Sequence, residues 1–554
     1  MFPSKVFFVV LILFGVYSAK SQDARPNIVW IVCEDISPTL SMYGDSTART
    51  PHLDQLATKS TIYKNAFTTV GVCAPSRSCI ITGMYPTSLG TMHMRTARDI
   101  SSWGKRTYKE NIPIVDISGD SIREYSAVIP EYVKCFTEFL RAEGYYCTNK
   151  QKTDYQFAPP ITAWDQNNDA SHWRNRPEGR PFFSVFNIHS THESRLWVNK
   201  DKPLTVSVDS VSIPPYLPDN AITRQDVARH YSNVELMDRF VGDIIEQLKE
   251  DGLYDNTVIF FYSDHGGPLP RQKREIYDSG LKVPLLIKNI KGKSSKYTDR
   301  LVSFVDFAPT ILSLAGIKPP AYMEGKAFMG KYEAAPRKYI FGSSDRFDEH
   351  TDRIRIVRNE RFLYVRNYYP DLPKYKDVNY RKNISMMQEM LRLEAGNELD
   401  ATVCQWFGTK PDEELYDCNS DPHNMHDLSN KAKYRTELQK LRMALFQHFQ
   451  SHSDLGLLPE AQLIDMMWPD QTQPTTLPPQ IAIQGNKLTL TAKTQGASMA
   501  YLLSDHPDMT LDFNSPWQLY TGPIAIQNSK YIYAIAERIG FKESTITVRK
   551  LDQN

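Results

Sequence analysis

The sequence predicts an α/β fold: a sandwich with a central, mostly parallel sheet, followed by a smaller α+β subdomain and an appended β-sandwich module. Three solid apolar runs, in "NIVWIVCED", "PFFSVFNIHSTHE" and "TVIFFYSDHGG", each end in polar residues. Runs that are apolar on both faces are typical of strands buried between helices, and their alternation with amphipathic helices is typical of α/β folds. The 554 residues are too many for one small core.

The composition narrows the class of protein. Hydrophobic residues make up 41% and aromatic residues 11% of the chain, which is typical of a globular protein. With 65 basic and 64 acidic side chains the net charge is +1, which argues against a nucleic-acid binder held by a global positive field. An anionic ligand must therefore be bound by a local group of cations.

The first segment is typical of a secretory signal peptide. In residues 1–21, Lys5 precedes the apolar run "VFFVVLILFGV", and the small residues Ser18 and Ala19 follow it. The run is too short for a spanning helix, which needs roughly 20 residues. We therefore expect a secreted or periplasmic protein with a cleaved signal and no membrane span; an uncleaved signal anchor is the alternative.

The remaining elements follow in order. Amphipathic stretches predict helices at 51–63, 131–144, 226–252 and 305–316, between the buried strands. Short alternating strands and a final helix predict the second unit, and a Pro- and Thr-rich segment without periodicity predicts a linker before further short strands. The expected boundaries are 22–335 for the α/β domain, 336–468 for the α+β subdomain, 469–480 for the linker and 481–554 for the β-sandwich.

The seven cysteines are few for an exported protein, so disulfides are not the main scaffold. Cys404 and Cys418 are close enough in the sequence to pair across a loop.

Two predicted strands end in residues that can bind a metal ion. Glu34 and Asp35 follow the first strand, and Asp264 and His265 follow the third. The carboxyl ends of parallel strands are where open α/β sheets bind ligands, so one shared site is expected. Three carboxylates favour a hard divalent cation such as Ca²⁺ or Mg²⁺.

The stretch "CAPSRSCIITG" predicts a helix that begins near Cys73, with Pro75 in its first turn and Gly83 as its end. Free N–H groups and the helix dipole at that end attract anions, and Arg77 adds a planar fork that fits a tetrahedral oxyanion. A thiol there is acidified and reactive, which accounts for Cys73 better than a merely buried cysteine does.

These residues resemble a known family. "CAPSRSCIITG" is similar to the C-x-P-S-R-x-x-x-x-T-G signature of type I sulfatases, in the alkaline phosphatase superfamily, and the resemblance extends over residues 25–450. It implies an alkaline-phosphatase-like fold. It also implies that a formylglycine-generating maturation enzyme oxidises Cys73 to formylglycine, whose hydrated aldehyde is the nucleophile.

The resemblance implies a role for each site residue. One divalent cation, most simply Ca²⁺ with Mg²⁺ as the alternative, would be held by Glu34, Asp35, Cys73, Asp264 and His265. Arg77, Lys152 and Lys273 would bind the sulfate and the nucleophile, His192 would be the general acid, and His189 its neighbouring hydrogen-bonding partner. Two positions depart from the family: Glu34 replaces an aspartate, and Asp154 stands where a histidine is usual.

The implied function is hydrolysis of sulfate esters on a sulfated polysaccharide or oligosaccharide. The early Glu-Asp pair, "KTDY" and "DASHWRNRPEG" are similar to the branch that includes N-sulfoglucosamine sulfohydrolases and enzymes of algal polysaccharides such as ulvan. Candidate sugar-binding residues are Asp154, His189, Arg95, Arg174 and Arg346. The last module resembles the Fn3-like C-terminal domain of chitobiase-type glycosidases. Two alternatives are a phosphodiesterase or phosphonate monoester hydrolase of the same superfamily, and a catalytically inactive carbohydrate-binding homologue.

Overall fold

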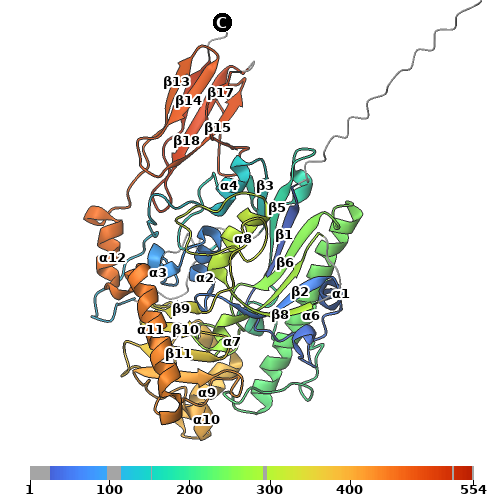
Figure 1. Ribbon diagram of the computed structural model, residues 1–554, viewed down its shortest axis with the longest axis vertical. Helices are drawn as coiled ribbons and strands as arrows, with labels where there is room; N and C mark the ends of the chain where they lie inside the picture. The colour runs from blue at the N-terminus through green and yellow to red at the C-terminus, as the bar shows by residue number, and fades with distance from the viewer. Residues whose placement is uncertain (1–24, 97–113, 151, 291–295, 527–528, 552–554) are drawn as a thin grey trace, which may run out of the picture.

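The computed structural model describes residues 25–96, 114–150, 152–290, 296–526 and 529–551 (Figure 1). The expected signal peptide at 1–21 lies outside the described residues. An eight-stranded sheet forms the centre, in the order β4-β3-β5-β1-β6-β7-β2-β8. Its strands are β1 Asn27–Cys33, β2 Ser60–Phe67, β3 Tyr146–Lys150, β4 Gln166–Asn167, β5 Phe182–Ile188, β6 Thr257–Ser263, β7 Lys282–Lys288 and β8 Lys296–Ser303.

The direction of the strands confirms the expected mostly parallel sheet. All pairings are parallel except those of β7, which runs antiparallel to β6 and to β2. The three central strands end level with one another, because Cys33 of β1 pairs with Ile188 of β5 and with Ser263 of β6. The residues that follow these strands therefore leave the sheet at one edge.

Helices cover both faces of this sheet. Trp30 and Val32 of β1 pack in one cluster with α2 (Cys73–Thr82), α4 (Phe136–Ala142) and α8 (Phe307–Leu314). The alternate residues Val29 and Ile31 pack with α1 (Pro51–Ala57) and the long α6 (Ala221–Glu250). Both faces of β1 are buried, which explains its unbroken apolar sequence.

A second, antiparallel sheet follows in the order β12-β11-β10-β9, with α11 (Arg435–Ser451) packed on it. Its strands are β9 Ile340–Ser344, β10 Ile354–Arg358, β11 Phe362–Asn367 and β12 Glu413–Asp417. Leu441 of α11 lies in one apolar cluster with Val357 and Leu415 of the sheet. This is the smaller α+β unit that the sequence predicts.

The remaining described helices are short. They are α3 Pro86–Leu89, α5 Arg195–Val198, α7 Asp278–Leu281, α9 Ser385–Ala395, α10 Ala401–Cys404 and α12 Glu460–Met467. None of the helices in the described ranges combines the length and the hydropathy that a bilayer crossing requires.

Two small antiparallel sheets form the C-terminal module, which projects from the rest of the molecule at the top of Figure 1. One has the order β13-β14-β17 and the other β16-β15-β18-β19. Leu488 and Leu490 of the first sheet pack against Ile532 and Ala534 of the second, so the module is a β-sandwich. The strands are β13 Gln480–Gln484, β14 Lys487–Thr491, β15 Ser498–Ser504, β16 Gln518–Leu519, β17 Ile524–Ala525, β18 Tyr531–Glu537 and β19 Thr547–Lys550.

The module is bound to the segment that surrounds α4 and β3. The Glu537 carboxylate accepts the backbone N–H of Ile161 at 2.6 Å, and Arg538 donates to the carbonyl of Ile129 at 2.7 Å. Ile161 also packs in one apolar cluster with Trp517 of the module. Polar and apolar contacts together fix the module on the α/β domain.

Two details differ from the sequence-based expectation. The predicted helix at 51–63 ends at Ala57, and β2 begins at Ser60, because "STIY" is a β-branched and aromatic run that pairs with β7. Cys404 and Cys418 do not form a disulfide: all seven cysteines are free, with Cys404 exposed and Cys418 buried.

Candidate active site

The edge where β1, β5 and β6 end collects the polar residues that the sequence analysis singled out. Glu34 and Asp35 follow β1, and Asp264 and His265 follow β6. The backbone N–H of Asp35 donates to Asp264 Oδ1 at 3.2 Å, which ties the two strand ends together. Asp35 has a φ of 54°, in the left-handed region, so its side chain leaves the strand direction at this point.

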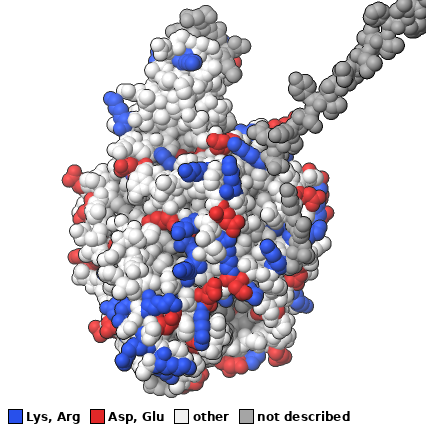
Figure 2. Space-filling view, viewed as in Figure 1, with Lys and Arg blue, Asp and Glu red and all other residues white. Residues whose placement is uncertain are grey.

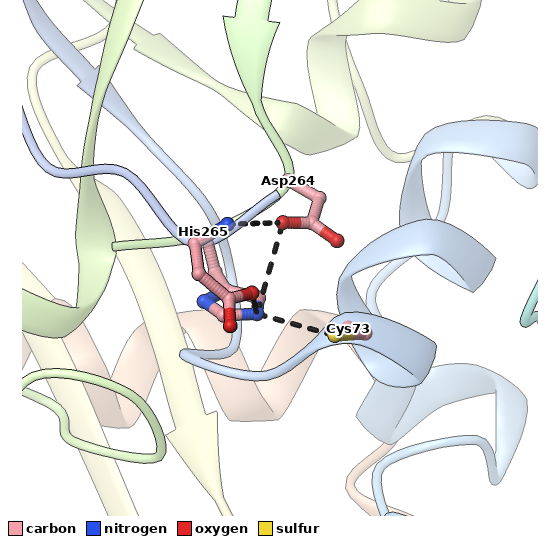
Figure 3. Close-up of side chains that lie close together, drawn as sticks. Cys73, Asp264 and His265 are labelled. Atoms are coloured by element: carbon pink, nitrogen blue, oxygen red, sulfur yellow. Dashed lines mark hydrogen bonds and ion pairs between the residues drawn. The ribbon is translucent and has the colours of Figure 1, made fainter. Parts of the chain in front are cut away.

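Helix α2 brings Cys73 to the same edge. The helix begins at Cys73 and ends before Gly83, whose φ of 72° provides the left-handed cap that the sequence predicts. Ser76 Oγ donates to the backbone carbonyl of Asp264 at 2.6 Å, so the first turn of α2 is bonded to the end of β6. Cys73 Sγ lies 3.3 Å from His265 Nε2 (Figure 3).

Four of these side chains form a compact group of metal-binding type. Ligand atoms of Asp35, Cys73, Asp264 and His265 all lie within 4.8 Å of one another, and all four residues are buried. His265 Nε2 is 3.0 Å from Asp35 Oδ1 and 3.7 Å from Asp264 Oδ1.

This group fits a divalent cation. His265 Nδ1 lies 3.0 Å from the carbonyl of Gly266, which can only accept, so in the neutral ring the lone pair is on Nε2 and faces the carboxylates. Asp35 Oδ1 is buried and, apart from facing His265, accepts no hydrogen bond. Burial lowers the pKa of His265, but Asp264 and Asp35 raise it to about 10 overall, so without an ion a proton takes the cation's place.

Glu34 points to a different set of partners. Its carboxylate accepts from Lys152 Nζ, and its Oε2 lies 3.0 Å from His189 Nδ1. Burial opposes ionisation, but Lys152 and His189 hold the pKa of Glu34 well below its usual value. The structure therefore places Glu34 beside Asp35 in the chain but outside the four-residue group.

Three buried cations surround the group. Arg77 Nε donates to Asp264 Oδ2 at 3.0 Å and its Nη1 donates to Asn187 Oδ1 at 2.7 Å. Lys273 Nζ donates to Asp35 Oδ2 at 2.6 Å, and Lys152 Nζ is bonded to Glu34. Burial opposes their charge, but the neighbouring acidic groups raise the pKa of both lysines above the ordinary value. All three stay protonated and can bind an oxyanion.

The imidazole of His192 contacts one of these cations, Lys273. Its Nε2 lies 3.3 Å from Lys273 Nζ and its Nδ1 lies 2.8 Å from Ser194 Oγ. Burial and the charge of Lys273 lower the pKa of His192 well below its ordinary value, so the ring is neutral before a ligand binds. An anion beside Lys273 would favour the protonated ring.

The other expected site residues lie at different distances from the centre. Asp154 is buried with Oδ2 3.4 Å from Lys152 Nζ, and Arg95 pairs with Asp348 at 2.5 Å. Arg346 is buried and pairs with Glu460 of α12, which is not a member of the four-residue group.

Arg174 lies at the surface, at the C-terminal end of α6, where its Nε is 2.8 Å from Asp251. Within the described ranges, Arg174 pairs with Glu250 and Asp251, and Arg346 bonds Glu460 and the carbonyls of Met94 and Asp348, so neither contacts the four-residue group. Positive and negative side chains are interspersed over the face of the molecule shown in Figure 2, in keeping with the net charge of +1.

Several residues that hold this site together are not among the predicted site residues. Asn187 accepts from Arg77, and the backbone N–H of Glu193 donates to Asp35 Oδ2 at 2.6 Å. Glu193 also binds Arg274 at 2.9 Å. Glu193 ends the "HSTHE" block and Arg274 follows Lys273. Their position next to predicted site residues is the sequence feature that could have pointed to them.

The two family models that match this chain, and two known proteins that are similar to it, are sulfatases or sulphohydrolases. The family model described as "Sulfatase" matches residues 26–317, and the model described as "N-sulphoglucosamine sulphohydrolase, C-terminal" matches 271–403. An "Ulvan-active sulfatase" of Formosa agariphila is 42% identical over 94% of this chain and 90% of the relative. The human "N-sulphoglucosamine sulphohydrolase" is 25% identical over 81% of this chain and 95% of the relative.

Solved structures show the same fold. The chain titled "Structure of BT4656 in complex with its substrate D-Glucosamine-2-N, 6-O-disulfate" superposes with a TM-score of 0.53 at 16% identity, over 77% of this chain and 98% of that one.

Proposed function

The chain belongs to the sulfatase family and is a sulfuric ester hydrolase; from this premise we propose that it removes sulfate from an algal polysaccharide of the ulvan type. The similarity to an ulvan-active sulfatase along 90% of that relative supports this substrate over a glycosaminoglycan. The observation that carries the proposal is the convergence of Cys73, two strand-end acids and His265 within 4.8 Å, ringed by three buried cations.

We propose that residue 73 acts as formylglycine. Oxidation converts the CH2–SH group of Cys73 into an aldehyde: two electrons pass to an oxidant supplied by the maturation enzyme, the C–S bond breaks with sulfur leaving as sulfide, and water supplies the aldehyde oxygen. Hydrated, this aldehyde supplies a geminal diol, one oxygen of which would take the sulfuryl group while the other later expels it as sulfate. The position of Cys73 at the start of α2, 3.3 Å from His265, supports this role because the nucleophile would face the cationic centre.

A divalent cation, most simply Ca²⁺, would be held by Asp35, Asp264, His265 and residue 73, with Glu34 as a neighbouring acid that supports Lys152. When bound, the cation would stabilise negative charge on the nucleophile and on the sulfate oxygens.

The chain's own residues would bind and orient the sulfate ester. Arg77 offers a planar fork, and Lys152 and Lys273 offer point charges, so that three non-bridging oxygens are met by fixed cations. The same cations help to keep the nucleophile deprotonated during attack.

His192 would give a proton to the leaving sugar oxygen. A sugar alkoxide is a poor leaving group, so protonation at that oxygen is needed in the transition state. His192 Nε2 lies 3.3 Å from Lys273 Nζ, which also donates to Asp35 Oδ2, so His192 is next to a cation of the site. His189, bonded to Glu34, and Asp154, beside Lys152, would orient these groups.

The proposal also covers the localisation and the domain boundaries of the protein. We propose that the signal at 1–21 is removed and that the protein is secreted or periplasmic. We also propose units at 22–335, 336–468 and 481–554 with a linker at 469–480; the sheets of the second and third units support these divisions.

Two measurements test the proposed function. Mass spectrometry of the peptide around Cys73, from protein made with the maturation enzyme, is expected to show an aldehyde, and that protein should release sulfate from ulvan oligosaccharides. The Cys73→Ala variant should fold but release none. An unconverted thiol in active protein would contradict the mechanism, and faster cleavage of phosphate esters than of sulfate esters would contradict the reaction.

A further inference from the structure

Two aromatic rings lie at the outer side of the site and have no part in the function proposed above. Trp197 belongs to α5, and Tyr380 directly precedes the 3-10 turn Arg381–Asn383. The two ring centroids are 5.1 Å apart with an interplanar angle of 76°. Both residues are half-buried, so they lie at the surface of the molecule rather than in its core.

These rings continue outward from the site in a defined order. Lys273 is buried and contacts Asp35, and His192 contacts Lys273 and is half-buried. The centroid of the Tyr380 ring is 6.4 Å from that of His192. If His192 protonates the leaving oxygen, the sugar attached to that oxygen lies next to His192 on the solvent side, where Tyr380 is found.

Buried charges fix the Tyr380 ring in place. The guanidinium carbon of Arg95 lies 5.2 Å from the ring centroid, and Arg95 pairs with Asp348 at 2.5 Å. Asp348 is bonded to Arg274 at 3.1 Å, and Arg274 is bonded to Glu193 at 2.9 Å. Because the Glu193 backbone also donates to Asp35, a continuous set of contacts joins the ring to the metal-binding group.

We propose that Tyr380, supported edge-on by Trp197 at an interplanar angle of 76°, is the stacking platform for the pyranose ring of the sugar that carries the scissile sulfate. The C–H faces of a pyranose are apolar, and half-exposed aromatic rings beside a cationic centre bind such faces without competing for the sulfate. This inference rests on the proposed function, because it requires that the leaving group be a sugar.

The test separates binding of the sugar from binding of the sulfate. In the Cys73→Ala background, calorimetry measures the Kd of a sulfated ulvan oligosaccharide and of inorganic sulfate. Tyr380→Ala is expected to weaken the oligosaccharide about tenfold, and Trp197→Ala by a smaller factor, while the Kd of sulfate stays within about twofold. Tyr380→Phe should retain oligosaccharide binding, because it keeps the ring.

A matched control is Tyr132→Ala. Tyr132 is exposed, lies in the segment before α4, and forms another aromatic pair, with its ring centroid 5.6 Å from that of Tyr322. This variant should change neither Kd. Equal weakening of oligosaccharide and sulfate by Tyr380→Ala, or no weakening at all, would overturn the platform, as would a failure of the Cys73→Ala protein to bind the oligosaccharide. Ring-dependent binding without sulfate release by the converted wild-type protein would instead overturn the proposed function, and Tyr380 would remain only a sugar-binding ring.

Discussion

Each of the three cations of the site is paired with a buried carboxylate. Arg77 is bonded to Asp264, Lys273 to Asp35 and Lys152 to Glu34, and all six side chains are buried. Buried charges of this kind are costly unless they are paired. The pairs therefore keep positive charge at fixed positions before any substrate arrives, which is the condition for electrostatic catalysis.

The fork geometry of Arg77 gives the first prediction. Arg77→Lys keeps one positive charge but cannot bond Asp264 and Asn187 together, so it should misplace that charge. We expect kcat/KM for sulfate release to fall by about 10²-fold to 10³-fold, measured at a temperature where the variant, by its thermal unfolding curve, is still folded. The matched control is Arg174→Lys on the surface, and a comparable loss there would show that the contacts of Arg77 are not the cause.

The position of His192 gives the second prediction. His192→Gln should reduce kcat on ulvan oligosaccharides by about 10²-fold to 10⁴-fold, because the sugar alkoxide then leaves unprotonated. The loss should be much smaller on a nitrophenyl sulfate, whose leaving group is a weak base. His189→Gln should show no such dependence on the leaving group; equal losses on both substrates for His192→Gln would exclude it as the acid.

At the scale of elements, α2 connects Cys73, the proposed nucleophile position, to the core. Its first residue is Cys73, and behind its last turn the carbonyl of Gly83 accepts the N–H groups of Glu324 and Gly325 at 3.0 and 3.1 Å. The helix is buried along its whole length. A displacement of α2 at Gly83 is therefore expected to move Cys73 as well.

Gly83 gives a prediction about this element. A Cβ at Gly83 would lie 3.2 Å from both Ala308 and Met323, at a φ of +72°. Gly83→Ala should destabilise the protein by about 2–4 kcal/mol, from left-handed strain plus crowding. Gly316 has a φ of +77° but open space around it, so Gly316→Ala should cost only the strain, about 1–2 kcal/mol. Chemical unfolding measures both values, and equal costs would contradict the role of crowding.

The local pattern of apolar and capping residues predicted the strands and the helix that carry the site, but not all of the residues that their side chains contact. The buried runs ending at Cys33 and Ser263 predicted the two strand ends, and Pro75 with Gly83 predicted α2, because burial and capping leave a mark in adjacent residues. The end of the first helix was predicted too late, at 63, since the apolar residues of β2 also fit a helical period.

Long-range ion pairs leave no such mark. The sequence offered Arg346 as a sugar-binding residue, but the structure buries it against Glu460, which is 114 residues away in the chain. Arg274 and Asp348 were not noticed, although they lie between the site and Tyr380. Charge on a residue can be read from the sequence, whereas its partner depends on the packing of whole units.

At the scale of the molecule, the C-terminal module is joined to the α/β domain through Glu537. This side chain accepts the N–H of Ile161, and the strand that carries it also contributes to the apolar cluster around Ile161. Burial raises the pKa of Glu537 to about 7, and the charges of Glu543 and Glu138 add to this effect. Protonation of Glu537 therefore favours the docked module.

This raised pKa predicts how stability depends on pH. In the unfolded chain Glu537 ionises near pH 4.5, so between about pH 4.5 and 7 the folded protein binds more protons and loses stability as the pH rises. Glu537→Gln keeps an acceptor for Ile161 but cannot ionise, so the loss of about 2–3 kcal/mol that the wild type should show between pH 5 and pH 8 should be absent. Unfolding followed at pH 5 and pH 8 measures the difference; parallel curves for the two proteins would contradict the assignment.

The bond between Glu537 and Ile161 joins residues 376 positions apart. At about 5–20 residues per second, a ribosome needs on the order of tens of seconds to make the chain between them. During that interval the loop that leads from Lys152 to Ile161 has been synthesised but lacks the strand that later secures it. The loop therefore gains this support only after β18 has been made, and a chain that stops before β18 would contain Cys73 and its helix but lack the bond that secures the loop.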